Sequence, residues 1–369
     1  MRPVVSPSSS TLIFRAPMWK VVHFFLGALA TLVVLELVLR PLPVMHGWEN
    51  PPVTMEFPMV RYLPHAAYSY SRAWNLLGAT RGRFNNLGYA AQDVDLKAPT
   101  IAVIGDSFVE AAMIAPGERI GDILAQRIPL QVAAFGISGA DLPDYMVTAD
   151  WVAGHIPTRM LIFVIVRGDL AGSVKPKLRG YWYHETLEHL EIRRNIAFTL
   201  RNTLSSSRLF NYLYYQLKVG PHMLRDNWRR PENSGIDQFG TGKKTPTSTN
   251  ATEEITPLMH AAAVQFIADA AALQRKGVSI ALVFDADRGA IYGGGGGKTA
   301  QEEVLAGLAQ QAGLRTISLA DAFASDYREH HQSFEYDKND SHWNAYGQQI
   351  VAKALLEELG LATLAVVDR

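Results

Sequence analysis

The apolar and polar positions divide the chain into three regions: an apolar N-terminal segment, a stretch without clear periodicity, and a long region in which strand and helix patterns alternate. In the first region, residues 19–39 are apolar except for Lys20, His23, Thr31 and Glu36. A helix of this length crosses the roughly 30 Å hydrocarbon core of a membrane. We therefore predict a transmembrane helix over residues 19–39.

The charges around this segment predict its orientation. Arg2 and Arg15 precede the apolar run, and basic residues favour the cytoplasmic side. This places residues 1–18 in the cytoplasm and the rest of the chain across the membrane. A cleaved signal peptide is the alternative, but the apolar run is long for one and no small-residue cleavage site follows before Arg40. Glu36, near the outer end, is expected to reach the interface or to pair with Arg40.

The remainder of the chain separates into a collar and a sheet domain. Residues 40–98 are rich in proline, tyrosine and asparagine and predict an irregular collar or linker with short strands. In residues 99–369, short apolar runs alternate with helical patterns, which predicts a parallel sheet covered on both faces. Residues 160–166 are all apolar and are expected to form a central strand. The predicted strands are 101–104, 130–134, 160–166, 278–284 and 315–319, and the predicted helices lie within 116–127, 257–275, 300–311 and 345–359.

An insertion at about residues 172–253 separates the third and fourth predicted strands. Residues 175–230 hold eleven Lys and Arg against four Asp and Glu, together with nine aromatic residues. Residues 201–219 have an amphipathic helical pattern, so a helical insertion is expected. Its role stays open between a cap that packs on the sheet domain and a surface that binds a polyanionic glycan, anionic lipid or a protein partner.

Composition excludes several classes of function. The 35 Lys and Arg residues balance the 35 Asp and Glu residues, so no overall field attracts nucleic acid. The chain has no cysteine, which excludes disulfides, thiolate metal sites and a cysteine nucleophile. Its eleven histidines are scattered, and nothing in the sequence requires a metal or a cofactor.

Three polar residues have the chemistry of a nucleophile, a base and an orienting acid. Ser107 follows the strand 101–104 at a turn that opens into a helical pattern, where free backbone N–H groups favour a developing negative charge. Asp340 and His342 are two positions apart in an extended segment, so their side chains project to the same side. Asp340 can then hold His342 in the tautomer that accepts a proton from Ser107. Taken singly, the segments also fit a helix cap and a surface turn.

These segments resemble the sequence blocks of the SGNH, or GDSL-type, hydrolase superfamily. The blocks are residues 105–108 (GDSF), 136–139 (GISG) and 340–347 (DSHWNAYG), and the similarity covers residues 99–359. The resemblance implies a flavodoxin-like α/β/α sandwich with three layers.

The resemblance also implies roles for individual residues. Ser107 would be the nucleophile, His342 the base and Asp340 the residue that orients the base. The backbone N–H groups of Ser107 and Gly136 would form the oxyanion hole. Superfamily members normally add an Asn side chain to this hole, but Gly168 stands at that position here. The Gly168 N–H or the Arg167 side chain would have to replace the missing donor, whose loss can cost roughly a hundred- to a thousandfold in rate.

The spacing of the last block also departs from the usual Asp-x-x-His, which would place Asn339 at the acid position. The Asp-x-His spacing of Asp340 and His342 resembles instead the proteins that O-acetylate alginate and related exopolysaccharides. This similarity favours a glycan acyltransferase over a lipase.

A second group of residues is considered for substrate binding. Asp285, Asp287 and Arg288 follow the predicted strand 278–284 and can bind sugar hydroxyls, although an ion-paired corner that fixes the next loop is the favoured interpretation. Asp106 and Trp343 neighbour the nucleophile and the base in sequence. The candidates for substrate binding are Asp106, Asp285, Asp287, Arg288 and Trp343.

The sequence as a whole predicts a single-pass protein of the inner, cytoplasmic membrane with its sheet domain in the periplasm. We expect a serine esterase or O-acetyltransferase that acts on a cell-envelope or secreted polysaccharide through an acyl-serine intermediate. We also expect protein partners in a polysaccharide secretion or modification assembly. Two alternatives stay open: a non-catalytic glycan-binding or scaffold component of such an assembly, and a membrane-anchored GDSL lipase or lysophospholipase.

Overall fold

A five-stranded parallel sheet forms the centre of the fold. The structure is a computed structural model and describes residues 18–177, 179–185, 190–196, 204–219 and 254–361. The strand order is β4-β3-β5-β8-β9, so the apolar third strand, β5, is central as predicted. The strands are β3 (Thr100–Gly105), β4 (Gln131–Gly136), β5 (Thr158–Ile165), β8 (Ser279–Phe284) and β9 (Arg315–Ser318).

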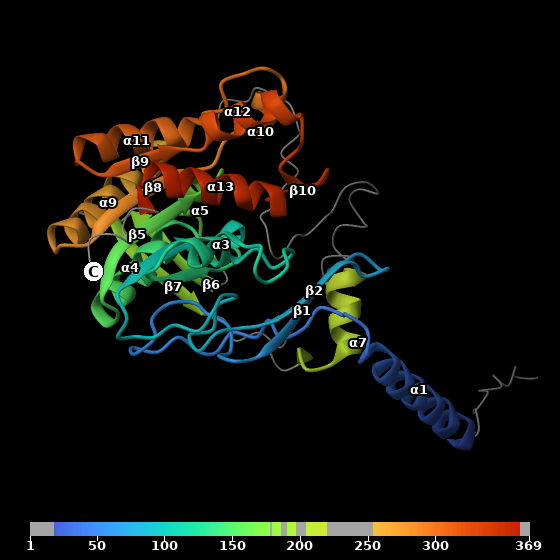
Figure 1. Cartoon of the computed structure of the whole chain (residues 1–369). Coiled ribbons are helices and arrows are strands. Elements are labelled where there is room, and N and C mark those ends of the chain that lie inside the picture. The colour runs from blue at the N-terminus through green and yellow to red at the C-terminus, as the bar shows by residue number, and fades with distance from the viewer. Residues whose placement is uncertain (1–17, 178, 186–189, 197–203, 220–253, 362–369) are drawn as a thin grey trace, which may run out of the picture.

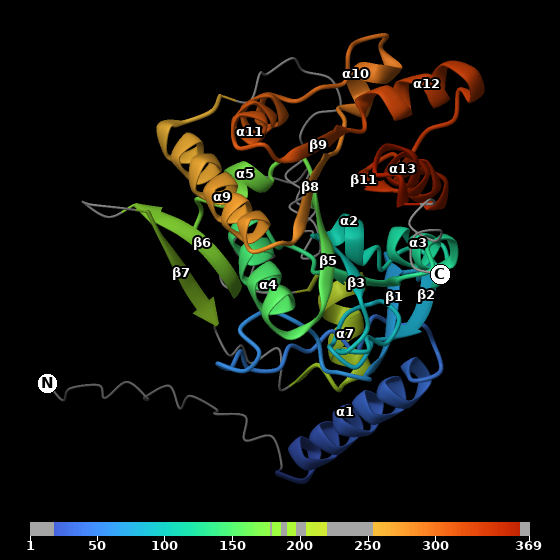
Figure 2. The ribbon, with the colours of Figure 1, turned by 60° about the vertical axis from the view of Figure 1, so that its left-hand side comes forward.

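Helices cover both faces of this sheet, which confirms the predicted α/β sandwich (Figures 1 and 2). Successive strand residues point to opposite faces, so Ala102 and Ile104 join one hydrophobic core while Ile101 and Val103 join the other. The first face is covered by α4 (Leu142–His155), α9 (Pro257–Arg275) and α11 (Ala300–Gln311), and the second by α3 (Ile120–Arg127), α12 (Ala320–His330) and α13 (Ala345–Glu358).

The sequence analysis located α9 and α11 but did not identify α4 and α12. Helix α4 is buried on most sides, so its apolar residues form no clear stripe. A local signal was present, because Asp141 and Asp144 form a capping box and Pro143 lies in the first turn. Helix α12 is mostly polar, with Phe323 buried in the core.

The collar is more ordered than its sequence pattern predicts. Strands β1 (Ala67–Arg72) and β2 (Leu77–Arg83) form an antiparallel hairpin. Four buried aromatic rings pack together beside it, with centroids 4.5–5.3 Å apart, and join the core of the first sheet face. Because it shares this core, the collar is part of the folded domain and not a linker. The four rings belong to Trp48, Tyr62, Tyr68 and Phe84.

The insertion differs from the predicted helical one. After the short helix α5 (Asp169–Gly172), its first part is an antiparallel hairpin of β6 (Arg179–Glu185) and β7 (Leu190–Ile196). Tyr181 and Tyr183 are buried while Trp182 between them is half-buried, as expected for alternate faces of a strand. Within the described part of the predicted amphipathic segment lie the short helix α7 (Arg208–Asn211) and the π-helix η1 (Tyr212–Gln216), which continues it. Residues 220–253 of the insertion lie outside the described residues.

Helix α1 (Met18–Leu39) projects from the domain (Figure 1). Within it, Trp19–Leu39 is long and apolar enough to cross a membrane, and its most apolar window is not buried by the rest of the protein. A signal sequence near the N-terminus can also meet this criterion of length and apolarity. The structure therefore agrees with the predicted span in length and apolarity.

Candidate active site

Ser107 lies at the carboxyl-terminal ends of the parallel strands. It is the first residue of the four-residue helix α2 (Ser107–Glu110), two positions after β3. The carboxylate of Asp106 caps this helix by accepting a hydrogen bond from the Phe108 N–H at 2.9 Å. A side chain at Gly136 would clash with the backbone of Glu110, so this glycine lets α2 pack against the end of β4.

His342 and Asp340 lie on β11 (Asp340–Trp343), which pairs with β10 (Glu335–Asp337). The strand directs both side chains to the same side. His342 Nε2 lies 2.7 Å from Ser107 Oγ, and His342 Nδ1 lies 2.5 Å from Asp340 Oδ1. The structure thus brings hydroxyl, imidazole and carboxylate together in the order that proton transfer from Ser107 requires.

The Ser107 hydroxyl has two neighbours that can accept its single proton. Asp106 Oδ2 lies 3.2 Å from Ser107 Oγ, whereas His342 Nε2 lies 2.7 Å away. The shorter contact favours the histidine as the acceptor. Asp106 is itself buried, and burial raises the pKa of its carboxyl, although the Phe108 amide and the charge of His342 oppose this. Its hydrogen bonds hold the start of α2, a structural role beside the substrate contact suggested by the sequence.

Arg72 adds a charge to the site that the sequence analysis did not find. Its Nη1 lies 2.9 Å from Asp340 Oδ2, and it comes from β1 of the collar, 268 residues away in sequence. Burial raises the pKa of the Asp340 carboxyl, but the hydrogen bonds from His342 and the charge of Arg72 outweigh it and hold that pKa below its usual value. Asp340 therefore stays ionised and can orient the imidazole.

The Gly168 amide, an expected oxyanion donor, is engaged elsewhere. Its N–H donates to Gln301 Oε1 at 3.2 Å, and the Gln301 side-chain amide donates to the Val166 carbonyl at 2.6 Å. Gln301, on α11, thus fixes the turn after β5. This corrects the expectation for Gly168, because an amide already bonded within the protein is not aimed at a developing oxyanion.

Gly136 occupies a more favourable position. The next amide, that of Ile137, donates to the Gly105 carbonyl of β3 at 3.2 Å. Successive amides of a strand point to opposite sides, so the Gly136 N–H points away from β3. The contribution of the Gly136 and Ser107 amides to an oxyanion hole stays a prediction.

A buried glutamate holds the loop after β4 to the helix that carries Ser107. The Glu110 carboxylate accepts hydrogen bonds from the Ser138 N–H and hydroxyl, both at 2.8 Å, and from the Tyr62 hydroxyl at 2.9 Å. Burial raises the pKa of Glu110, while these hydrogen bonds oppose the shift. A lone glutamate in the apolar stretch after Ser107 was the sequence signal for a structural role.

Asp285 and Arg288 form the ion-paired corner that was favoured over sugar binding for residues 285–288, and Trp343 joins it. Arg288 Nη1 lies 2.5 and 2.7 Å from the two carboxylate oxygens of Asp285, and the Trp343 indole N–H donates to Asp285 at 3.0 Å. Arg288 also pairs with Glu335 at 2.9 Å and donates to the Ser341 carbonyl. All three side chains are buried, so the structure gives them no surface for a sugar.

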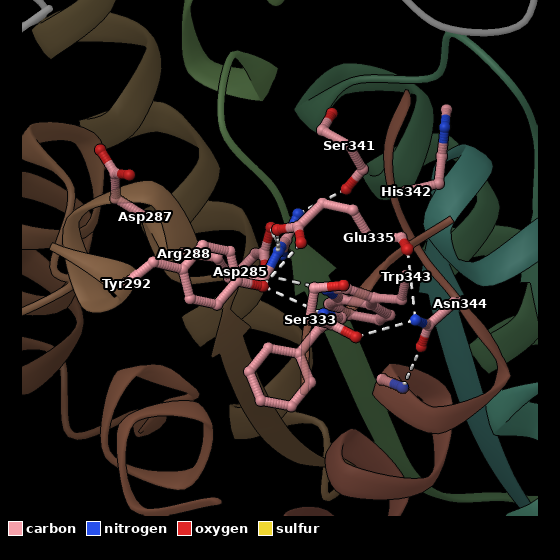
Figure 3. A network of polar contacts seen from close by, with 12 residues as sticks. Asp285, Asp287, Arg288, Tyr292, Ser333, Glu335, Ser341, His342, Trp343 and Asn344 are labelled. Carbon is pink, nitrogen blue, oxygen red and sulfur yellow. Dashed lines mark hydrogen bonds and ion pairs between the residues drawn. The ribbon is translucent and has the colours of Figure 1, made fainter. Parts of the chain in front are cut away.

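This corner holds the strand that carries the Asp–His pair. Figure 3 shows Trp343 pointing into the network and His342 pointing away from it, because adjacent strand residues face opposite sides. Asp287 differs from its neighbours: its side chain is about one-third exposed, caps α10 (Arg288–Tyr292) and lies 3.5 Å from Arg167. A substrate contact at Asp287 stays a prediction.

We expect Arg288→Met to destabilise the protein strongly. The substitution leaves Asp285 buried without its cation, which typically costs about 3–5 kcal/mol of unfolding free energy. Thermal unfolding of the full chain in detergent measures the effect. The matched control is Arg127→Met, which removes an exposed arginine at the end of α3. Equal melting temperatures for the two variants would contradict a structural role for the corner.

The chain resembles solved structures at low sequence identity. No protein-family model and no curated protein matches the chain. Among solved structures, it is similar to an alpha/beta hydrolase from the metagenome of Lake Arreo, Spain, with 12% identity, a TM-score of 0.39 and coverage of 72% of this chain and 96% of the other. An acetyl xylan esterase matches with 12% identity, a TM-score of 0.35 and coverage of 70% and 99%. A salicylyl-acyltransferase from a tetracycline biosynthetic pathway matches with 12% identity, a TM-score of 0.37 and coverage of 79% and 60%. At these values the function has to be argued from the geometry around Ser107.

Proposed function

We propose that the protein is a serine-dependent enzyme that transfers an acyl group, most simply acetyl, from an ester through an acyl-serine intermediate. The observation that carries this proposal is the contact chain from Ser107 through His342 to Asp340, with distances of 2.7 and 2.5 Å. Ser107 lies 235 residues from His342, which shares β11 with Asp340, and a helix cap or a surface turn does not require the two segments to meet. The sequence blocks that resemble the SGNH superfamily support the same assignment.

In the first half-reaction, Ser107 Oγ attacks the ester carbonyl and its proton passes to His342 Nε2. Asp340 stabilises the imidazolium that forms. The tetrahedral intermediate then collapses: the bond to the leaving alcohol breaks, and His342 returns the proton to that alcohol. The acyl group stays on Ser107.

In the second half-reaction, a hydroxyl group removes the acyl group from Ser107. His342 takes the proton of the incoming hydroxyl, and the serine recovers its own proton from His342 as the acyl–serine bond breaks. If the hydroxyl belongs to water the enzyme is an esterase, and if it belongs to a sugar the enzyme is an O-acetyltransferase. The proposal includes both outcomes, because the acceptor decides between them.

The surroundings of Ser107 favour a small acyl group. Only 3% of the Ser107 surface is exposed, and His342 is 9% exposed. An acetyl group needs less space beside the serine than a long acyl chain. This supports an acetyl ester over a lysophospholipid, and a preference for long chains would favour the lipase alternative.

We further propose that the enzyme is anchored by Trp19–Leu39 in the inner membrane, with the sheet domain in the periplasm and a cell-envelope or secreted polysaccharide as the substrate. The support is the apolar length of α1, the basic residues before it and the Asp-x-His spacing at Asp340. In that setting, partners in a polysaccharide modification assembly are expected.

The non-catalytic alternative rests on the oxyanion site. Gly168 replaces the usual asparagine, and its amide is bonded to Gln301. A glycan-binding or scaffold protein would need no oxyanion donor there. The alternative does not explain why Ser107, His342 and Asp340 form an ordered contact chain.

Mass spectrometry of the intact protein tests the proposal. After brief incubation of the full chain with p-nitrophenyl acetate and acid quenching, we expect a mass increase of one acetyl group, mapped to the peptide that contains Ser107. A glycan oligomer added before the quench would remove the adduct faster than water does if the protein is a transferase. No adduct on Ser107, together with no turnover, would leave the scaffold alternative.

Replacing Arg72 is expected to shift the pH profile. Arg72 partly offsets the negative charge of Asp340, so Arg72→Gln lets the carboxylate stabilise the imidazolium of His342 more strongly. The histidine then keeps its proton to higher pH, and the acidic limb of kcat/KM moves upward by about half to one pH unit. Arg72→Lys keeps the positive charge, so the acidic limb should return most of the way to its wild-type position on the pH axis. If Arg72 only stabilises the fold, both variants change the amount of active protein and leave the limb in place.

A further inference from the structure

The anchor helix and the insertion meet at one carboxylate. Glu36, near the end of α1, accepts hydrogen bonds from the Ser207 hydroxyl at 2.8 Å, the Arg208 N–H at 3.1 Å and the Leu209 N–H at 2.9 Å. Figure 1 shows α7 beside this end of α1. The first turn of α7 therefore lies at the same depth as Glu36, wherever α1 is in the membrane.

That depth is fixed by the length of the apolar segment. Trp19–Leu39 has 21 residues, and at about 1.5 Å per residue nearly all of them are needed to cross the hydrocarbon. Glu36 precedes Leu39 by three positions, so it lies roughly 5 Å inside the end of the span. The hydrogen bonds from Ser207, Arg208 and Leu209 and the expected ion pair with Arg40, at 3.4 Å, satisfy the Glu36 carboxylate there, which explains why an acidic residue is tolerated in the segment. The start of α7 must then lie in the outer interface of the membrane.

The surface that continues from this point is apolar on its open side. Leu213 and Leu217, on and just after η1, are 36% and 40% exposed, whereas Asn211 and Gln216 are buried on the side facing the domain. Trp74, at the tip of the β1–β2 hairpin, is 69% exposed, and its carbonyl accepts a hydrogen bond from the Tyr212 hydroxyl.

The charges and aromatic rings of the segment also fit a membrane surface. Residues 204–219 contain Arg208 and Lys218 and no acidic residue. Arg40, which follows the end of α1, is largely exposed although it also pairs with Glu36 at 3.4 Å. Basic residues next to a span attract anionic headgroups. The segment also holds three tyrosines, and Tyr and Trp are enriched at the boundary between hydrocarbon and water.

We propose that residues 204–219 and Trp74 form a second membrane contact, which lies in the headgroup region of the leaflet from which α1 emerges and binds anionic lipid. We call this surface the interfacial seat. The proposal depends on the proposed function of α1 as a membrane span. The seat is joined to the strand that carries Arg72, because the side-chain amide of Gln216 lies 3.1 Å from the hydroxyl of the adjacent Ser71. The seat and the span together hold the domain, and with it Ser107, at a fixed height above the bilayer.

The absence of cysteine makes a direct depth measurement possible. Single cysteines are introduced in the full chain, labelled with a nitroxide and reconstituted in vesicles of phosphatidylcholine with phosphatidylglycerol. The seat positions are Leu213→Cys, Leu217→Cys and Trp74→Cys. Leu29→Cys, in the middle of α1, reports on the span, and Val264→Cys, an exposed apolar position on α9, is the matched control away from α1. Collision with oxygen, which concentrates in lipid, is compared with collision with a water-soluble nickel chelate.

We expect the ratio of oxygen to nickel collisions at the three seat positions to lie between that of Val264→Cys and that of Leu29→Cys. We also expect it to fall toward the control when phosphatidylglycerol is omitted. If Leu29→Cys reports hydrocarbon but the seat positions match Val264→Cys, the seat is overturned and the span stands. If Leu29→Cys reports water, the span falls and the seat with it. Seat labels shielded from both reagents would mean that protein covers this surface, which also overturns the proposal.

Discussion

Replacing Ser107 by alanine is expected to abolish acyl transfer, with a loss of kcat on the order of 10⁴- to 10⁶-fold. Ser107 Oγ is the only atom of the contact chain that can form the acyl ester, and alanine removes it without disturbing the backbone of α2. His342 and Asp340 cannot replace it, because each acts only through the serine proton. The measurement is release of p-nitrophenol from p-nitrophenyl acetate by the full chain, with the acetyl adduct measured in parallel.

The matched control for this experiment is Ser279→Ala. Ser279 is exposed at the start of β8, whereas Ser107 follows the end of β3. Because these strands are parallel, the two serines lie at opposite ends of the strands. The control should keep the full rate. If Ser107→Ala also keeps the rate, or still forms an acetyl adduct, another residue is the nucleophile and the proposed mechanism is wrong.

The second large effect is expected at Asp340. In Asp340→Asn, the side chain loses the charge that stabilises the imidazolium, and its amide can hold His342 in the tautomer whose Nε2 carries a proton and cannot accept one. Loss of an orienting carboxylate of this kind lowers kcat by roughly 10³- to 10⁴-fold. The rate of p-nitrophenol release at saturating substrate measures it, and circular dichroism checks that the variant is folded.

Asp337→Asn separates orientation of the base from general electrostatics. Asp337 also pairs with Arg72, at 3.4 Å, but it is more exposed than Asp340, and Asp340 holds His342 Nδ1. We expect Asp337→Asn to change kcat by less than about tenfold, since an exposed ion pair contributes little. Similar losses in both variants would show that Asp340 acts only as one of two charges near Arg72.

Side chains of adjacent residues on a strand point to opposite sides, and this decides the role of Trp343. The same argument that places Asp340 and His342 on one side of β11 places Trp343 on the other. Trp343 was a candidate for substrate binding, but the structure buries its side chain against Asp285. Similarly, residues 179–185, in which Tyr181 and Tyr183 are buried, form a strand where a helical insertion was expected.

Local sequence patterns were enough to predict the sheet, its central strand and several covering helices. Strand β5 and helices α9 and α11 lie where the apolar periodicity placed them. The residues that each element buries are only a few positions apart in sequence, so their pattern can be recognised locally. The location of Ser107 at the sheet edge also followed from the sequence, since residues after parallel strands collect at one edge.

Only the tertiary structure decided which side chains meet around that edge. Arg72 reaches Asp340 across 268 residues, Gln301 occupies the Gly168 amide, and Glu36 joins α1 to Ser207. The residues next to a charged or polar side chain in sequence do not identify its partner. The partner is determined by how distant segments pack and by which groups would otherwise be buried unpaired. The sequence determined the elements and the residues with suitable chemistry, and packing determined the contacts that orient them.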